Sequence, residues 1–101
     1  MDETATVYIL LCADGSYYTG LTQKEPEARL WEHNAGVVKG YTSTRRPVQL
    51  VFAEPFVRIV DAIDTERRIK GWSRAKKEAL IARDFDLLQR LSRNRKDFPK
   101  G

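Results

Sequence analysis

The chain has 101 residues, of which 42% are hydrophobic, and a net charge of +4 at pH 7. This length has room for one domain, and the apolar content excludes a disordered chain because it suffices for a packed core. A single cysteine excludes an internal disulfide, and Cys12 with His33 is too small a set for a structural zinc site. Any bound metal therefore has to use oxygen ligands.

No apolar run approaches the length that crosses a bilayer. The N-terminal segment MDETATVY has neither a basic stretch nor a small-residue cleavage site. We therefore expect a cytoplasmic protein that does not associate with membranes.

Charge is unevenly distributed along the chain. Residues 1–66 hold six Lys and Arg against ten Asp and Glu, whereas residues 67–101 hold twelve against four. A basic segment after an acidic body is typical of a protein that binds polyanions, because neutralised phosphates release counterions. The alternative is a soluble surface that happens to be rich in Lys and Arg.

Two strands joined by a turn are predicted at the start of the chain. Residues 5–12 alternate in the manner of a strand, Asp14-Gly15 marks a turn, and a second strand covers residues 17–22. Each strand carries a tyrosine, Tyr8 in the first and Tyr18 in the second.

The length of this turn decides whether the two tyrosines share a face of the sheet. A two-residue loop would place Tyr8 and Tyr18 on opposite faces, because a slip of one residue exchanges the faces. A three-residue loop over residues 14–16 pairs Cys12 with Tyr18. It separates apolar from polar residues between the two faces of the sheet better than the two-residue loop does. We therefore predict the odd loop, which pairs Leu10 with Gly20 and gathers three residues on one face: Tyr8, Tyr18 and Gly20.

A helix is predicted from Pro26, which fits a first turn, to just before Gly36, which fits past a helix end. Arg29 and His33 stand four residues apart and form a polar ridge. The expected core-facing stripe is apolar: Ala28, Trp31 and Ala35, with Leu30 beside it.

Residues 37–47 have no apolar periodicity and are predicted to be a loop, in which the Arg45-Arg46 pair is a candidate phosphate contact. A third strand covers residues 48–52, with an extension to residue 56 left open, and Pro55 indicates an edge position or the end of the strand. Three strands with several helices predict the α+β class.

A second helical pattern covers residues 59–70 and ends before Gly71, with Glu66 in the middle of its apolar stripe. A carboxylate on a core-facing line is costly to desolvate unless it is paired or binds a metal. Two interpretations remain open, a metal ligand or a partner for a cation such as Arg29 or Lys70.

Ser73 is expected to cap a basic helix, and a last helix covers residues 84–92. The tail after it is basic. Candidate contacts to nucleic acid in this part of the chain combine cations with one aromatic ring that could stack on a base: Lys70, Trp72, Arg74, Lys76 and Lys77.

Together these residues carry a resemblance to a known family. The segments VYILLCADGSYYTGLT, ARLWEHNAG, RRPVQLV and ERRIKGWSRAKKEALI resemble the small bacterial single-domain members of the GIY-YIG nuclease superfamily. The likeness covers residues 5–83 and implies one domain over residues 1–101, with 84–101 as a basic helical tail. It also implies a three-stranded antiparallel sheet flanked by helices, and one divalent cation, Mg²⁺ or Mn²⁺.

The resemblance implies a catalytic set of Tyr8, Tyr18, Arg29, His33 and Glu66. In this set Glu66 holds the metal and Arg29 binds the non-bridging oxygens. Either tyrosine can act as the base; we favour Tyr8, with Tyr18 orienting water or phosphate. His33 hydrogen-bonds a tyrosine or donates a proton, and Gly20 allows the sheet to approach the phosphate. A pair of Cys12 with His33 is less favoured, because Cys12 lies in an apolar strand.

The predicted function is metal-dependent hydrolysis of phosphodiester bonds in nucleic acid, with DNA favoured over RNA, in repair or processing. The alternative is a nucleic-acid-binding module that keeps the fold without turnover. We expect specificity to come from the loops and basic helix of this chain or from a protein partner.

Overall fold

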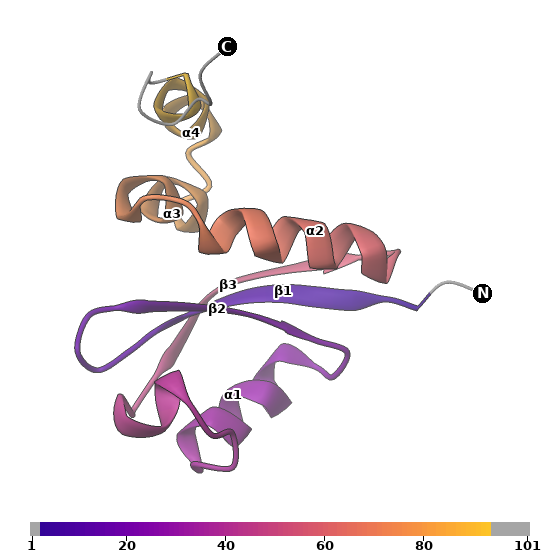
Figure 1. Cartoon of the computed structure of the whole chain (residues 1–101), viewed down its shortest axis with the longest axis vertical. Helices are drawn as coiled ribbons and strands as arrows, with labels where there is room; N and C mark the ends of the chain where they lie inside the picture. The colour runs from indigo at the N-terminus through magenta and orange to yellow at the C-terminus, as the bar shows by residue number, and fades with distance from the viewer. Residues whose placement is uncertain (1–2, 94–101) are drawn as a thin grey trace. The chain divides into compact units, whose positions relative to one another are not determined.

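Three antiparallel strands form the centre of the molecule. A computed structural model describes residues 3–93, with β1 (Ala5–Leu11), β2 (Tyr17–Thr22) and β3 (Gln49–Phe56) in the order β2-β1-β3 (Figure 1). The central strand β1 holds more of the buried apolar residues than any other element, because it is paired on both sides. Pro55 lies in the edge strand β3, so the edge position, one of its two interpretations, is the one observed, and the strand extends to Phe56. The predicted α+β class with a three-stranded antiparallel sheet is confirmed.

Helices cover both faces of this sheet. α1 (Pro26–Asn34) lies on one face and α2 (Ile59–Lys70) on the other (Figure 1). A short 3-10 helix, η1 (Tyr41–Thr44), packs beside α1 within the segment predicted to be a loop. The apolar stripe predicted for α2 is confirmed, with Ala62 and Ile69 buried.

The chain divides into two compact units, residues 1–70 and residues 71–101. The second unit contains α3 (Arg74–Ile81) and α4 (Phe85–Ser92), which pack against each other. Ser73 caps α3, as predicted: its hydroxyl accepts the Lys76 N–H at 3.2 Å. The basic tail beyond residue 93 lies outside the described residues. No helix among residues 3–93 is long and apolar enough to cross a membrane.

The hairpin loop has odd length, but its pairing differs from the prediction. The Cys12 N–H donates to the Ser16 carbonyl at 2.8 Å, so the loop comprises residues 13–15 rather than 14–16. Leu10 therefore pairs with Tyr18, and the predicted pairing of Cys12 with Tyr18 is wrong. The cause is local: the Asp14 carboxylate accepts both the N–H and the hydroxyl of Ser16.

The consequence of this register for the tyrosines is unchanged. Tyr8 pairs directly with Gly20, and Tyr18 is two positions from Gly20 on the same strand. All three therefore lie on one face of the sheet, as predicted, because side chains alternate with a period of two.

The inward face of α1 is the opposite of the predicted one. Trp31 is 67% exposed, and Ala28 and Ala35 are also exposed, whereas His33 is fully buried. His33 points inward because both of its ring nitrogens find hydrogen-bond partners, Tyr8 in the sheet and Thr42 in η1, which removes the usual cost of burying a polar side chain. The packed face of this helix therefore combines His33 with Leu30, which packs against the core as predicted, and with the partly buried Arg29.

Candidate active site

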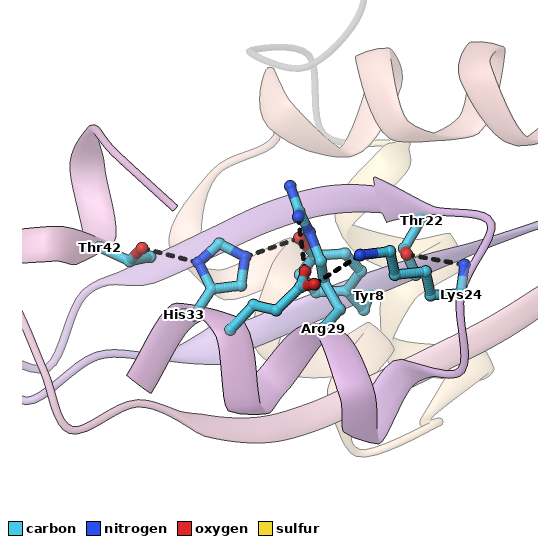
Figure 2. Close-up of polar contacts among 7 residues, drawn as sticks. Tyr8, Thr22, Lys24, Arg29, His33 and Thr42 are labelled. Carbon is cyan, nitrogen blue, oxygen red and sulfur yellow. Dashed lines mark hydrogen bonds and ion pairs between the residues drawn. The ribbon is translucent and has the colours of Figure 1, made fainter. Parts of the chain in front are cut away.

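A chain of three buried polar side chains crosses from the sheet to η1. Tyr8 Oη and His33 Nε2 are joined by a hydrogen bond of 2.8 Å, and His33 Nδ1 and Thr42 Oγ1 by one of 2.7 Å (Figure 2). All three residues are at most 1% exposed. A neutral imidazole donates through one nitrogen and accepts through the other, so this chain can relay a proton.

Gly20 is required by the position of the Tyr8 ring. A Cβ at Gly20 would lie 2.5 Å from both Cζ and Oη of Tyr8, and 3.0 Å from Cε2 of Tyr18. Only glycine leaves room for the phenol to reach His33. The sequence interpretation assigned Gly20 to the approach of a phosphate, and its structural neighbour is the tyrosine.

Replacing Gly20 with alanine should destabilise the fold by about 1–3 kcal/mol, because the added methyl group overlaps the Tyr8 phenol. Urea unfolding of the two proteins measures this difference. In a Tyr8→Leu background the same substitution should cost much less, since the overlapping atoms are gone. Equal costs in both backgrounds would show that the clash is not the cause.

Tyr18 lies beside this chain and is half-buried. Its ring centroid is 5.2 Å from that of His33, in an edge-on arrangement, and 6.3 Å from that of Tyr8, with the two rings tilted. Its other neighbour is Tyr41, whose ring is stacked on it at 6.1 Å. The structure thus brings both predicted tyrosines to the same histidine.

Arg29 is held next to Tyr8 by an acidic neighbour on its own helix. Nη1 of Arg29 donates to Glu32 at 2.9 Å, and Glu32 also pairs with Lys24 (Figure 2). The Arg29 Nε is a buried donor without a hydrogen-bond partner among the described residues. An unpaired buried N–H of a guanidinium beside a phenol favours an added negative charge at this point.

Burial sets the protonation states of the two central groups. Desolvation raises the pKa of Tyr8, and the Arg29 guanidinium beside it acts in the opposite direction. Burial also lowers the pKa of His33, and the charge of Arg29 adds to that effect. At neutral pH the chain therefore consists of a neutral phenol and a neutral imidazole that can accept a proton.

The lowered pKa of His33 predicts a loss of stability in mild acid. The unfolded chain takes up a proton at about pH 6.5 while the folded chain does not, so stability falls as the pH drops below that value. The slope should reach at most about 1.4 kcal/mol per pH unit.

Unfolding free energies at several pH values between 7 and 5 measure this slope. Because His33 is the only histidine, the slope should be absent from a His33→Gln variant. The carboxyl groups of Asp14 and Glu32, whose pKa values are lowered by hydrogen bonds, lose their contribution only at more acidic pH. A variant that keeps the wild-type slope would contradict the assignment.

The other predicted contact residues have partners of their own. Arg45 bonds Asp14 and lies over the ring of Tyr41, while Arg46 donates to the carbonyls of Asn34 and Ser43. In the second unit Lys76 is buried over the ring of Trp72, so the basic face expected on α3 does not include it. Arg74 pairs with Glu78, and Lys77 is half-buried.

Two residues of this cluster were not predicted from the sequence. Thr42 lies in a Ser- and Thr-rich segment without periodicity, and nothing in that segment distinguishes it from its neighbours. Glu32 could have been found, because it stands three residues after Arg29 on one helix, the spacing of an ion pair.

The comparison with known proteins places this geometry in a family. A family model described as the GIY-YIG catalytic domain matches residues 4–79. The chain belongs to the GIY-YIG family. The family resemblance predicted from the sequence motifs is therefore confirmed.

Similar proteins are small, and the match covers about three quarters of this chain and nearly all of theirs. The UPF0213 protein SSP2268 of Staphylococcus saprophyticus is 47% identical over 76 residues, which cover 75% of this chain and 92% of that protein. The UPF0213 protein VNG_2274C of Halobacterium salinarum is 49% identical over 75 residues, covering 74% and 96%.

Two solved structures share this GIY-YIG fold. The solution NMR structure of the UPF0213 protein BH0048 from Bacillus halodurans is 34% identical with a TM-score of 0.52, over 93% of this chain and 90% of that one. The solution NMR structure of EF2693 from E. faecalis is 37% identical with a TM-score of 0.56, over 86% and 93%.

Glu66, the predicted metal ligand, comes from the layer opposite α1. Its side chain is 14% exposed and pairs with Lys70 at 2.6 Å, as one of the two sequence interpretations expected. The described residues contain no group of three or more His, Cys, Asp or Glu that could hold a metal. GIY-YIG nucleases generally use a divalent cation. A single carboxylate is enough to hold such a cation only when water and substrate oxygens supply most of the cation's other ligands, as Mg²⁺ prefers. The convergence of Glu66 with the tyrosines stays a prediction.

Proposed function

We propose that this protein is a metal-dependent nuclease that hydrolyses phosphodiester bonds in nucleic acid, with DNA as its preferred substrate. The observation that carries the proposal is the buried bond between Tyr8 and His33 beside the Arg29 guanidinium. Such a pair has little value for stability alone, since an apolar pair of the same shape would avoid the cost of burying polar groups. Its value lies in moving a proton.

In the proposed reaction Tyr8 accepts a proton from the attacking water while its own proton passes to Nε2 of His33. The neutral state of His33 at pH 7 leaves that nitrogen free to accept it. In the tautomer that this transfer requires, Nδ1–H of His33 donates to Oγ1 of Thr42, 2.7 Å away, which also holds the ring in its orientation. Arg29 stabilises negative charge on Tyr8 and on the non-bridging phosphate oxygens.

Glu66 holds the divalent cation in this proposal, which follows the family rather than an observed site. When bound, the cation supplies positive charge at the phosphoryl oxygens and acidifies water. Lys70 now pairs with the Glu66 carboxylate and would compete with the cation. Tyr18 orients water or phosphate from beside His33.

Thr42 is a positioning residue in this account. A Thr42→Val substitution should lower the cleavage rate about 10- to 100-fold, because the His33 ring loses its fixed tautomer and orientation. A Thr42→Ser variant keeps the hydroxyl and should restore most of the rate. In the valine variant kcat should fall while KM changes little, because the loss is in the reaction and not in binding. Rescue by serine excludes a general loss of structure as the cause.

The proposal is tested by incubating the protein with end-labelled single-stranded, duplex and branched DNA, and with RNA, in Mg²⁺ and in EDTA. Cleavage that requires the metal supports a nuclease. Salt-dependent binding without cleavage of any substrate would establish the alternative, a binding module on the same fold.

A further inference from the structure

A row of stacked planar groups leads from the proposed site to the surface. Its inner end is Tyr18, which the His33 ring meets edge-on with 60° between the planes. The row continues through the ring of Tyr41 and ends at the guanidinium of Arg45. The Tyr18 and Tyr41 rings are nearly parallel, with 21° between their planes, and the Arg45 Cζ lies 3.8 Å from the Tyr41 centroid. We call Tyr18, Tyr41 and Arg45 the stacked row.

The outer end of the stacked row is held in place by several bonds. Nε of Arg45 donates to the Asp14 carboxylate at 2.9 Å, and Nη1 donates to the Tyr41 carbonyl at 2.8 Å. The Ala13 N–H also donates to the Arg45 carbonyl at 2.9 Å, which ties this residue to the hairpin turn. The plane of the guanidinium is therefore fixed before any ligand arrives.

The charge balance at Arg45 favours a flat ligand over a phosphate. Asp14 neutralises the guanidinium and its carboxylate is half-exposed, so a phosphate would meet an acidic neighbour. A guanidinium that is weakly hydrated and already paired still offers its face for stacking. Arg45 is 34% exposed and Tyr41 is 42% exposed, so the end of the row is at the surface.

We infer that the stacked row of Tyr18, Tyr41 and Arg45 binds an unpaired nucleobase of the nucleic acid next to the phosphate that is cleaved. The inference rests on the proposed function and names the form of its substrate. Bases stack on aromatic rings and on arginine planes only where they are free of their partner strand, so the row selects single-stranded, flipped or terminal nucleotides. It also revises the role predicted for Arg45, from a phosphate contact to a base platform.

The test uses binding in EDTA, so that it does not depend on cleavage. Oligonucleotides carry one 2-aminopurine, whose fluorescence is quenched when it stacks, in a single strand, at a fraying end and inside a closed duplex, as DNA and as RNA. The wild-type protein should bind and quench the unpaired probes and leave the closed duplex probe bright. Bound single strands whose probe stays bright would overturn the inference, as would an absence of binding.

Matched variants locate the platform. Arg45→Lys keeps the charge and removes the plane, and should weaken single-strand binding about tenfold and abolish the quench. Tyr41→Leu removes the ring on which the Arg45 guanidinium is stacked. It should also weaken single-strand binding and reduce the quench. Lys39→Gln removes an exposed cation from the same segment and should weaken single-strand and duplex binding equally, with the quench retained.

The outcomes separate this inference from the proposed function. A full quench in the Arg45→Lys and Tyr41→Leu proteins, with both folded by circular dichroism, would overturn the platform even if the wild type cleaves DNA. A quench that these variants lose supports the platform even if no substrate is cleaved in Mg²⁺.

Discussion

A Tyr8→Phe variant should cleave its substrate about 100- to 10,000-fold more slowly than the wild type, the range expected when a general base is removed. The substitution deletes one oxygen atom, the one that bonds Nε2 of His33 and lies beside the Arg29 guanidinium. Single-turnover rates with protein in excess over substrate measure this loss. Binding in EDTA should change little, because the substitution removes a single oxygen atom and the ring remains.

Tyr18→Phe is the matched control for this result. Tyr18 contacts His33 through its ring, at 5.2 Å between centroids, and the ring persists in the variant. Its loss of rate should therefore be clearly smaller than that of Tyr8→Phe. If the order of the two effects is reversed, Tyr18 is the base and Tyr8 supports it.

The pH dependence of the cleavage rate tests the role of His33 as the group that accepts the proton of Tyr8. Burial and the charge of Arg29 lower the pKa of His33, so the wild-type rate should fall only as the pH drops well below about 6.5. An Arg29→Gln variant removes that charge, and the acid limb of its profile should move to higher pH.

A Glu66→Gln variant is expected to lose cleavage by about 1000-fold, which corresponds to about 4 kcal/mol of transition-state stabilisation. Glutamine keeps the shape of the side chain and removes the charge that would hold the cation. The apparent affinity for Mg²⁺, read from the metal dependence of the rate, should fall in the same variant. Binding of nucleic acid in EDTA should persist.

Asp64→Asn provides the control on the same helix. Asp64 is an exposed acid that pairs with Arg68, four residues along α2, so the substitution makes the same chemical change without touching Glu66. Its rate should match the wild type. A Glu66→Gln protein as active as Asp64→Asn would remove Glu66 as the metal ligand.

Much of the scaffold follows from local patterns in the sequence. Knowing that the hairpin loop has an odd number of residues was enough to place Tyr8, Tyr18 and Gly20 on one face of the sheet. The loop itself is centred one residue earlier than predicted. The exact pairing depends on how the Asp14 carboxylate folds back onto Ser16, which side-chain alternation does not encode.

The orientation of α1 shows where pattern reasoning fails. Apolarity predicts that Trp31 packs inward, but the helix turns His33 to the sheet because Tyr8 and Thr42 complete its hydrogen bonds. These partners are 25 and 9 residues away in the chain. A single helix sequence cannot reveal them.

The measurement that tests the account most directly compares three proteins purified in the same way: wild type, Tyr8→Phe and Glu66→Gln. Each is incubated in excess with the best-bound labelled substrate, with Mg²⁺ and with EDTA. We predict rapid cleavage by the wild type in Mg²⁺ alone and a loss of at least about 100-fold in both variants. Equal cleavage by all three proteins, or binding by the wild type without any cleavage, would contradict the assignment of this cluster as a nuclease active site.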